Sequence, residues 1–353
     1  MKIKITKWIA VMAALCSILT FTACGSKSTS IATNIGKPFV FKIGSERAEE
    51  TEFLLYLTNI ANKYEKVYGT GFWELKEEDG TTMLDKCKNL ALAQLAQVKA
   101  MKLLAKEKEI VLSEEENAMV LQAAQQYMDT LSSEEKAALG IEDISVIQEI
   151  YCDKFLADKL YLYLIRDVNP EISDDEARII TVQHILLKTY TVDDHGNRTE
   201  LDAGACSKVL KKAEEILEEA LDGESFESLT SKYNEDSKST YSFGKGDMEE
   251  AFEKVAFDLA KDEISKVVRT SQGYHIMKCI STLDREQTDL NKEKLLISRK
   301  QQVFGETYYQ FVAELKKQEN KDLIQNMVLQ GFDVADTMEM FEIYESQLGN
   351  ILE

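Results

Sequence analysis

The spacing of apolar residues changes abruptly near residue 180, and this change constrains the fold more than any other feature of the sequence. Over 48–168, and again over about 290–315, apolar residues recur every three or four positions, as on one face of a helix. Over 179–283, short β-rich runs alternate with short helical patterns. Only two prolines occur, at Pro38 and Pro170, so long helices are permitted. The sequence therefore predicts helical flanks around a distinct α/β unit.

Capping signals place the ends of several elements. Ser113, Ser132 and Ser173 are each followed three residues later by glutamate, the pattern of a capping box at a helix start. In the first flank we expect a strand over 38–42 and helices from 49, 83, 114 and 133 and over about 144–167. In the middle segment we expect the order β-α-α-α-β-β, with strands over 181–187, 267–270 and 274–280, a polar loop over 189–204, and helices over 207–221, 226–233 and 249–257. The segment from 321 onward receives no assignment.

The first 30 residues have the pattern of an export signal rather than of a fold. Three lysines precede an uncharged apolar run over 8–23, which is short for a membrane span. The run ends in Phe21-Thr22-Ala23-Cys24 and a polar Gly/Ser stretch follows. This resembles a bacterial lipobox, although such motifs usually carry leucine where Phe21 stands, and the resemblance implies lipidation of Cys24. An uncleaved helical anchor is the alternative. Both interpretations place the body at the extracytoplasmic face of a membrane.

Charge and cysteine spacing disfavour two classes of function. The formal net charge is −20, and about −23 once residues 1–23 are removed, which disfavours a nucleic-acid binder, because such a protein needs a basic surface. The cysteines Cys87, Cys152, Cys206 and Cys279 are far apart and form no C-x-x-C pair. With only three histidines in the chain, a metal site is not supported, and we expect buried free thiols.

Four motifs in the middle segment follow one another in the order of a known family. They are Gln183-His184-Ile185-Leu186, then Phe226-Glu227-Ser228-Leu229 with Tyr233-Asn234-Glu235-Asp236-Ser237, then the stretch from Phe243-Gly244-Lys245-Gly246-Asp247-Met248 to Phe257, and then Thr270-Ser271-Gln272-Gly273-Tyr274-His275. Together they resemble the parvulin family of peptidyl-prolyl isomerases. With the helical flanks and the lipobox, the whole chain resembles PrsA-type foldase lipoproteins and, more loosely, SurA-like periplasmic chaperones.

The resemblance implies a site without a cofactor or a metal. His184 and His275 would form a buried pair that Asp236 and Thr270 orient. Met248, Phe252, Phe243 and Gln272 would contact the substrate, and Met248 and Phe252 would grip the proline ring. Prolyl isomerisation breaks no bond to carbon, and an apolar surface with a few oriented polar groups can favour the twisted amide. Taken singly, each of these residues is more readily explained as structural than as functional: a core histidine, ordinary helix spacing, or a turn cap.

Two departures from the family pattern bear on activity. The glycine-rich stretch after the acidic turn is shortened to Lys238-Ser239-Thr240-Tyr241, where the apolar residue expected to line the proline site has no clear counterpart. Gln272 stands where smaller residues are common. The loop over 189–204 holds Arg198 but no basic cluster, and recognition of a phosphate needs such a cluster. We therefore expect no preference for phosphorylated Ser/Thr-Pro.

The sequence thus predicts an α+β chain in which a parvulin-like α/β domain is inserted between N- and C-terminal helical segments that form one chaperone-like lobe. The expected division is a signal peptide over 1–23, a lipidated cysteine and tether over 24–35, a helical domain over 36–172, the isomerase domain over 173–285, and a C-terminal helix and tail over 286–353.

The expected function is isomerisation and chaperoning of exported polypeptides that contain X-Pro bonds. A holdase with an inactive parvulin domain and a scaffolding lipoprotein are the alternatives. The apolar stripes of the flanks either bind unfolded clients or form core, and the sequence leaves a homodimer open.

Overall fold

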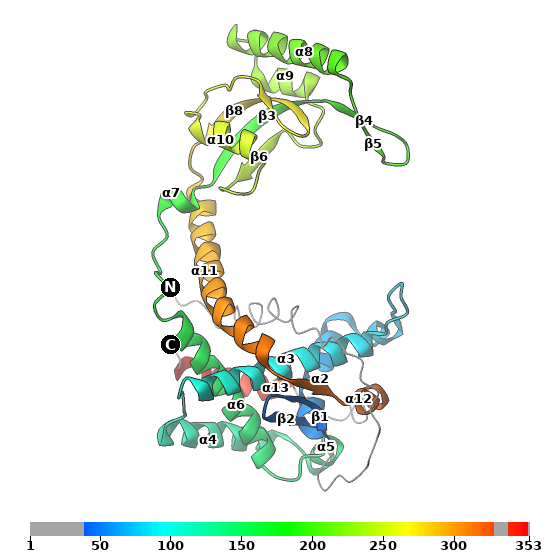
Figure 1. Ribbon diagram of the computed structural model, residues 1–353, viewed down its shortest axis with the longest axis vertical. Coiled ribbons are helices and arrows are strands. Elements are labelled where there is room, and N and C mark those ends of the chain that lie inside the picture. Colours follow the sequence, from blue (N-terminus) through cyan, green and yellow to red (C-terminus); the bar gives the residue numbers. More distant parts are fainter. Residues whose placement is uncertain (1–38, 328–337, 352–353) are drawn as a thin grey trace. The chain divides into compact units, whose positions relative to one another are not determined.

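The computed structural model describes residues 39–327 and 338–351, and these form two compact units. The helical unit comprises residues up to 168 and from 301 onward, and the α/β unit comprises residues 169–300 (Figure 1). The predicted export signal, Cys24, the tether over 24–35, Pro38, Phe332 and Val334 lie outside the described residues. No helix among the described residues is long and apolar enough to cross a membrane.

The helical unit is built around long helices whose apolar stripes form its core. Its elements before residue 169 are β1 (Phe39–Ile43), β2 (Glu46–Glu49), α2 (Glu50–Tyr68), η2 (Thr70–Glu74), α3 (Met83–Glu107), α4 (Glu114–Thr130), α5 (Ser133–Ala138) and α6 (Ser145–Ile165). The capping boxes predicted at Ser113 and Ser132 are confirmed, and Thr82 provides a third. Residues of the predicted stripes such as Phe53, Leu95 and Met101 are at most 1% exposed. These residues therefore form core, as one of the two interpretations of the stripes predicted, and they are not a surface that binds clients.

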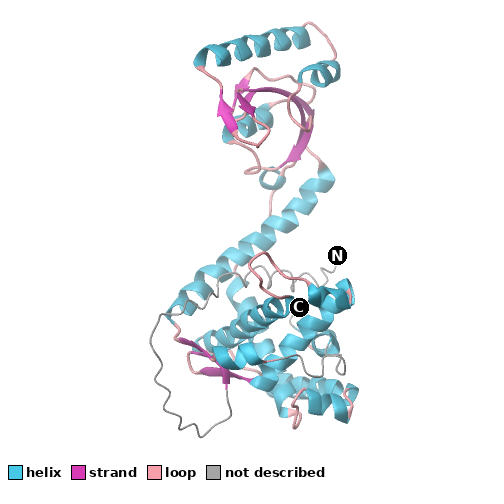
Figure 2. Cartoon of the chain, turned by 90° about the vertical axis from the view of Figure 1, so that its right-hand side faces the viewer, coloured by secondary structure: helices cyan, strands magenta, loops and turns pink. Residues whose placement is uncertain are grey.

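The C-terminal segment completes this unit. It contributes the last part of α11 (Arg285–Glu314), β9 (Lys317–Glu319), α12 (Lys321–Asn326), α13 (Met338–Gln347) and η3 (Gly349–Ile351). Strand β9 pairs antiparallel with β1 in a sheet of order β2-β1-β9 (Figure 2). Tyr344 of α13 is fully buried, and its hydroxyl donates a hydrogen bond to Asp158 of α6 at 2.6 Å. The two ends of the described chain therefore share one core.

A buried cluster of charges lies among α2, α3 and α6. The ammonium group of Lys99 is 2.7 Å from a carboxylate oxygen of Glu52 and 2.8 Å from one of Asp153. Burial raises the pKa of Glu52 to about 7, because the loss of water outweighs the attraction of Lys99. The pKa of Lys99 is raised as well, since Glu52 and Asp153 together outweigh the effect of burial on the ammonium group.

The α/β unit contains a four-stranded antiparallel sheet of order β6-β3-β8-β7. The strands are β3 (Ile180–Lys188), β6 (Thr240–Phe243), β7 (Val268–Arg269) and β8 (Gly273–Ser281), and a separate hairpin joins β4 (Tyr190–Val192) to β5 (Arg198–Glu200). The helices are α7 (Asp174–Ala177), α8 (Ala203–Leu221), α9 (Phe226–Tyr233) and α10 (Glu250–Asp258). Strands β3 and β8 pair along most of their length in the centre of the sheet.

The alternation of side chains along β3 sends residues to two different cores. Ile185 and Leu187 face α8 and α9, whereas Ile180 and Val182 pack with Phe252 and other residues on the α10 side. Figure 1 shows α8 and α9 on one side of β3 and β8, with α10 on the other. Because the period is two, His184 points to the α10 side, as Val182 does.

Several expected boundaries in the α/β unit are wrong. The order β-α-α-α-β-β omits β6, and the segment 189–204, expected as a loop, contains the β4–β5 hairpin. All three residues of β5 and two of the three in β4 are exposed, so they carry no apolar alternation. Helix α8 begins at Ala203 instead of residue 207, because Asp202 caps it by accepting a hydrogen bond from the Ala205 amide. In the helical unit, strands β2 and β9 were likewise not predicted. Helix α9 of the α/β unit has the predicted bounds.

The cysteine prediction is confirmed in part. The four cysteines of the described residues are free thiols, and Cys87 and Cys279 are buried. Cys152 and Cys206 are only half-buried, contrary to expectation.

We predict that Glu52→Gln removes a pH dependence from the stability of the helical unit. The pKa of Glu52 is higher in the folded than in the unfolded chain, so the folded state holds an extra proton between about pH 4.5 and 7. Its contribution to stability is therefore full below this window and is lost as the pH rises, with a slope approaching about 1.4 kcal/mol per pH unit. The variant lacks this slope. Urea unfolding at pH 5 to 8 measures it, with Trp73 as the only tryptophan once residues 1–23 are removed.

The matched control is Glu50→Gln on the same helix, since Glu50 is exposed. Parallel stability profiles for wild type and Glu52→Gln across this pH range would contradict the assignment.

Candidate functional site

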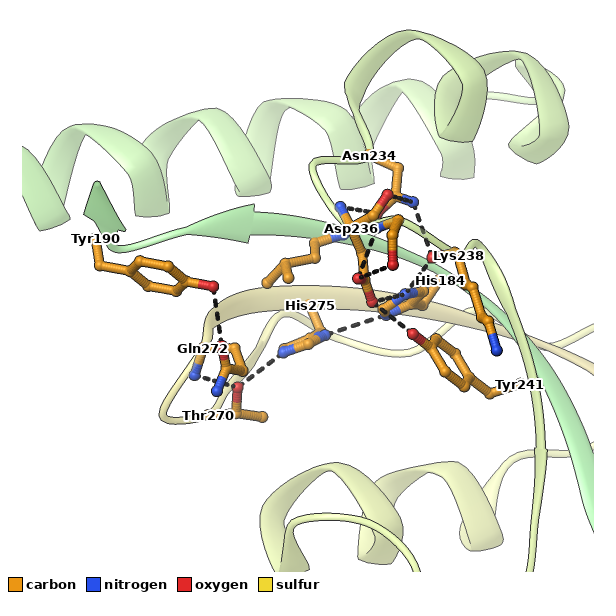
Figure 3. A network of polar contacts seen from close by, with 11 residues as sticks. His184, Tyr190, Asn234, Asp236, Lys238, Tyr241, Thr270, Gln272 and His275 are labelled. Carbon is orange, nitrogen blue, oxygen red and sulfur yellow. Dashed lines mark hydrogen bonds and ion pairs between the residues drawn. The ribbon is translucent and has the colours of Figure 1, made fainter. Parts of the chain in front are cut away.

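Two histidines meet on the α10 side of the sheet, at the centre of a polar network (Figure 3). His184 of β3 lies opposite Met277 of β8, and His275 of β8 lies opposite Leu186 of β3. Such diagonal neighbours on adjacent strands are within reach of long side chains. The Nδ1 atoms of the two imidazoles are 3.2 Å apart, and both residues are buried. The structure thus brings together the two histidines that the sequence singled out.

The hydrogen-bond partners determine which nitrogen of each ring carries a hydrogen. Nε2 of His184 faces only acceptors, the Lys238 carbonyl at 3.1 Å and an Asp236 carboxylate oxygen at 3.3 Å, so this nitrogen is a donor. Nδ1 of a neutral His184 then carries no hydrogen and accepts a hydrogen bond from Nδ1–H of His275. Nε2 of His275 carries no hydrogen either, and it accepts a hydrogen bond from the Thr270 hydroxyl at 2.8 Å. That hydroxyl oxygen accepts the Gln272 amide hydrogen at 3.0 Å, which completes a consistent set.

Both rings are neutral at physiological pH. Burial lowers the pKa of His184, although Asp236 and the Lys238 carbonyl oppose this effect. Burial and, secondly, a positive charge on His184 lower the pKa of His275 to about 4. If both Nδ1 atoms carried a proton, two donors would face each other, which disfavours protonation of the second ring. The two imidazoles therefore form an uncharged pair whose hydrogens are fixed in direction.

Aromatic and aliphatic side chains cover the imidazoles. The Phe252 ring of α10 is nearly perpendicular to both, with centroids 5.1 Å from His275 and 5.8 Å from His184. Phe243 is buried beside Phe252 at 5.8 Å between centroids. Met248 is half-buried against the same apolar cluster. The predicted Phe243, Met248 and Phe252 thus lie on the side of the sheet that holds the histidines.

The turn after α9 holds Asp236 in place. The Asn234 side-chain oxygen accepts hydrogen bonds from the amides of Leu186 and Asp236, while its NH₂ group donates to the Asp236 and Lys238 carbonyls. Burial alone would raise the pKa of Asp236, but hydrogen bonds from Tyr241 and Ser237 outweigh it, and the pKa lies below its ordinary value. Asp236 is therefore an anion with a fixed orientation.

The turn between β7 and β8 positions Thr270 and His275. Gly273 has φ +146°, and a Cβ atom there would lie 2.1 Å from the Leu187 carbonyl oxygen, so only glycine fits. Glu249, at the start of α10, accepts hydrogen bonds from the Ser271 amide and from its hydroxyl at 2.8 to 3.0 Å. Glu249 thus ties the turn that carries Thr270 to the helix that carries Phe252.

The β4–β5 hairpin contacts the same turn from another side. The Tyr190 hydroxyl donates to the Gln272 side-chain oxygen at 3.0 Å, and Arg198 donates to the Ser271 carbonyl at 2.6 Å. The Arg198 guanidinium lies 3.8 Å from the centre of the Tyr190 ring and pairs with Glu200 at 2.6 Å. The side chain of Gln272, predicted to contact substrate, therefore bonds to this hairpin.

Sequence reasoning missed Tyr190, Tyr241 and Glu249 as residues of the site. Tyr241 donates a hydrogen bond to Asp236 at 2.8 Å. A strand over 240–243 would have been the only available signal for it, since alternation from buried Phe243 places Tyr241 on the same face. Tyr190 and Glu249 contact Gln272 and Ser271, which are far from them in the sequence, so no local sequence pattern predicts these contacts.

The chain is similar to known proteins in its sequence. Residues 184–281 match the family model of the rotamase, described as a PPIC-type PPIase domain. The Foldase protein PrsA of Caldanaerobacter subterraneus is 25% identical over 314 residues, covering 85% of this chain and 92% of that protein. The PrsA foldase of Bacillus subtilis is 40% identical over 91 residues, which is 24% of this chain and 30% of that protein. A crystal structure of PrsA from Bacillus cereus aligns with 20% identity and a TM-score of 0.35, covering 77% of this chain and 97% of that chain.

These matches identify a parvulin-type peptidyl-prolyl isomerase domain within a chain that is similar to the PrsA foldases over most of its length.

We predict that His275 titrates near pH 4 and that its midpoint rises in His184→Gln. Burial, the larger cause of the lowered pKa, remains in the variant, whereas the charge of His184 is removed. The midpoint should therefore rise but stay below the ordinary histidine value. Imidazole ¹H–¹⁵N spectra between pH 3.5 and 8 measure it, and the three histidines of the chain keep these spectra simple. The same spectra of wild type should show His184 as the Nε2–H tautomer and His275 as the Nδ1–H tautomer.

An ordinary midpoint for His275 in the folded wild-type protein would contradict the assignment. A folded His184→Gln variant with an unchanged midpoint would show that the two rings are not coupled.

Proposed function

We propose that this PrsA-type foldase catalyses cis/trans isomerisation of X-Pro bonds in exported polypeptides and assists their folding outside the cytoplasm. The observation that carries the proposal is the contact between two buried, neutral imidazoles at 3.2 Å, covered by the Phe252 ring. The match of residues 184–281 to a peptidyl-prolyl isomerase domain supports it.

The reaction requires little covalent chemistry from the residues of the site. Rotation about the X-Pro bond must overcome a barrier of about 20 kcal/mol that arises from amide resonance. The twisted transition state has lost this resonance, and its carbonyl is less polar than in the planar amide. An apolar surface that holds the proline ring favours this state over the planar one. The neutral histidine pair suits this task better than a charged one, because a buried positive charge would hold water.

The proposed roles follow from the positions of the residues. Phe252 and Met248 contact the proline ring, and Phe243 supports Phe252 from behind. His184 and His275 form the floor, and Asp236 and Thr270 fix their hydrogens. Gln272 contacts the substrate chain at the rim, where its backbone amide holds Thr270.

We further propose that the substrate is unmodified at the residue before proline. A phosphate needs free cationic donors. The guanidinium of Arg198, on the hairpin nearest the site, is engaged by Glu200, the Ser271 carbonyl and the Tyr190 ring. Phosphorylated Ser-Pro peptides should therefore bind no better than their unmodified forms.

Phe252→Ala should lower kcat/KM for an X-Pro peptide by about tenfold or more. The ring buries apolar surface of the proline, and such a contact is worth about 1.5 kcal/mol or more. Isomer exchange in a proline peptide, followed by NMR on the protein lacking residues 1–23, measures the rate without a coupled protease. Proline-limited refolding of a client protein provides a second readout.

The matched control is Phe257→Ala on the same helix. Phe257 packs against Phe243 and the Arg178 guanidinium, so its loss also removes packing but no ring beside the imidazoles. Equal loss of activity in both folded variants would rule out the proline contact at Phe252. No acceleration by folded wild type, together with suppressed aggregation of a proline-free client, would favour the holdase alternative over an isomerase.

We also propose that a lipid on Cys24 anchors the protein at the extracytoplasmic face of the membrane. The support is the lysine-rich start, the uncharged run over 8–23 and the sequence Phe21-Thr22-Ala23-Cys24. The polar residues over 25–30 suit a flexible tether. A lipid would keep the isomerase domain close to chains that emerge from the membrane.

Cys24→Ser should release the protein from the membrane fraction of a bacterial expression host. In wild type, cleavage before Cys24 and acylation should appear as an N-terminal mass that includes the lipid, and the protein should enter the detergent phase. A Cys24→Ser protein that stays in the membrane with residues 1–23 attached would support the uncleaved-anchor alternative. Cys87→Ser is the control, since Cys87 is a buried thiol in the helical unit.

A further inference from the structure

Tyr241 lies beside the predicted catalytic residues, although no expectation assigned it a role. It sits on β6 opposite Val182 of β3. Its hydroxyl donates to the Oδ2 atom of Asp236 at 2.8 Å. The edge of its ring meets the imidazole of His184, with centroids 5.2 Å apart and planes at 86°. Figure 3 shows Tyr241 at the opposite end of the network from Tyr190.

The hydroxyl acts on the carboxylate oxygen that faces His184. Oδ2 of Asp236 is the oxygen 3.3 Å from His184 Nε2, so the phenol and the imidazole converge on the same atom. The other oxygen, Oδ1, accepts the Ser237 amide hydrogen at 2.7 Å. The Asp236 side chain is 26% exposed, so water can compete for it. The phenol is a fixed donor that holds this oxygen in position where water would be mobile.

The ring of Tyr241 supplies apolar surface. The shortened segment 238–241 contains no other large apolar side chain. The Tyr241 ring packs against the cluster that includes Phe252 and Phe243, as Met248 does. It is half-buried, so part of it remains accessible beside the imidazoles.

We propose that Tyr241 is a positioning residue whose hydroxyl holds Asp236 toward His184, and that its ring forms one wall of the surface that binds the proline. This inference rests on the proposed isomerase function.

Two substitutions separate the hydroxyl from the ring. Tyr241→Phe keeps the ring and removes the donor, so kcat should fall by about tenfold, as for loss of one hydrogen bond to a charged group, while KM stays nearly constant. Tyr241→Ala removes both, and KM should rise in addition. Peptide exchange by NMR on the chain lacking residues 1–23 gives both constants.

A second readout does not depend on activity. The hydrogen bond from Tyr241 helps to lower the pKa of Asp236, so the ¹³C titration midpoint of this carboxyl group should rise in Tyr241→Phe. The population of the Nε2–H tautomer of His184 should fall in the same variant. Tyr190→Phe is the matched control for the midpoint, because it removes a phenol hydroxyl from the Gln272 end of the network and should leave Asp236 unchanged.

The outcomes are separable. An Asp236 midpoint and kcat that both equal wild type in folded Tyr241→Phe would overturn the positioning role. A KM for Tyr241→Ala equal to that of Tyr241→Phe would overturn the ring's part in binding. If wild type itself shows no isomerisation, the proposed function fails, and the Asp236 midpoint still decides whether Tyr241 controls the carboxylate.

Discussion

One hydrogen between two buried nitrogens organises the α/β unit. Nδ1 of His184 and Nδ1 of His275 are 3.2 Å apart, and a hydrogen bond there requires one ring to donate and the other to accept. That requirement extends outward: Asp236 and the Lys238 carbonyl must accept at one side, and Thr270 must donate at the other. The partners come from the turn after α9 and from the turn before β8. The sheet register that sets His184 diagonal to His275 therefore determines this hydrogen-bond chain as well as the packing of the two strands.

Burial acts on ionisable groups in both units, with different results. In the α/β unit, burial favours neutral histidines, and the two imidazoles remain uncharged near pH 7 beside the ionised Asp236. In the helical unit, burial raises the pKa of Glu52 to about 7, yet Lys99 and Asp153 remain beside it as a paired cluster. Removing one partner of such a cluster leaves an uncompensated buried charge, which costs more stability than the intact cluster adds.

The sequence predicted those features that local patterns record. Ser113 and Ser132 marked helix starts, α9 had the expected bounds, and the motif order led to His184 and His275. Strand β9 was not predicted because its partner β1 is about 275 residues away and neither strand is long. Strand β6 was not predicted because Thr240 and Ser242 are typical of a loop, and only the pairing with β3 shows that they form a strand. Tyr241 was hidden with it, since its role depends on which face of that strand it occupies.

The hydrogen bonds of the network all run in one direction, toward the Asp236 carboxylate. The Gln272 amide donates to Thr270, the Thr270 hydroxyl to His275, His275 to His184, and His184 to Asp236. Tyr241 and Ser237 donate to Asp236 from the other side, so every hydrogen points toward this carboxylate. Hydrogen bonds in such a chain polarise one another. The Asp236 carboxylate and the Lys238 carbonyl together set the orientation of both imidazoles, so whatever holds the carboxylate in place helps to fix the two rings. In this chain, a tyrosine on a short edge strand is placed to do so.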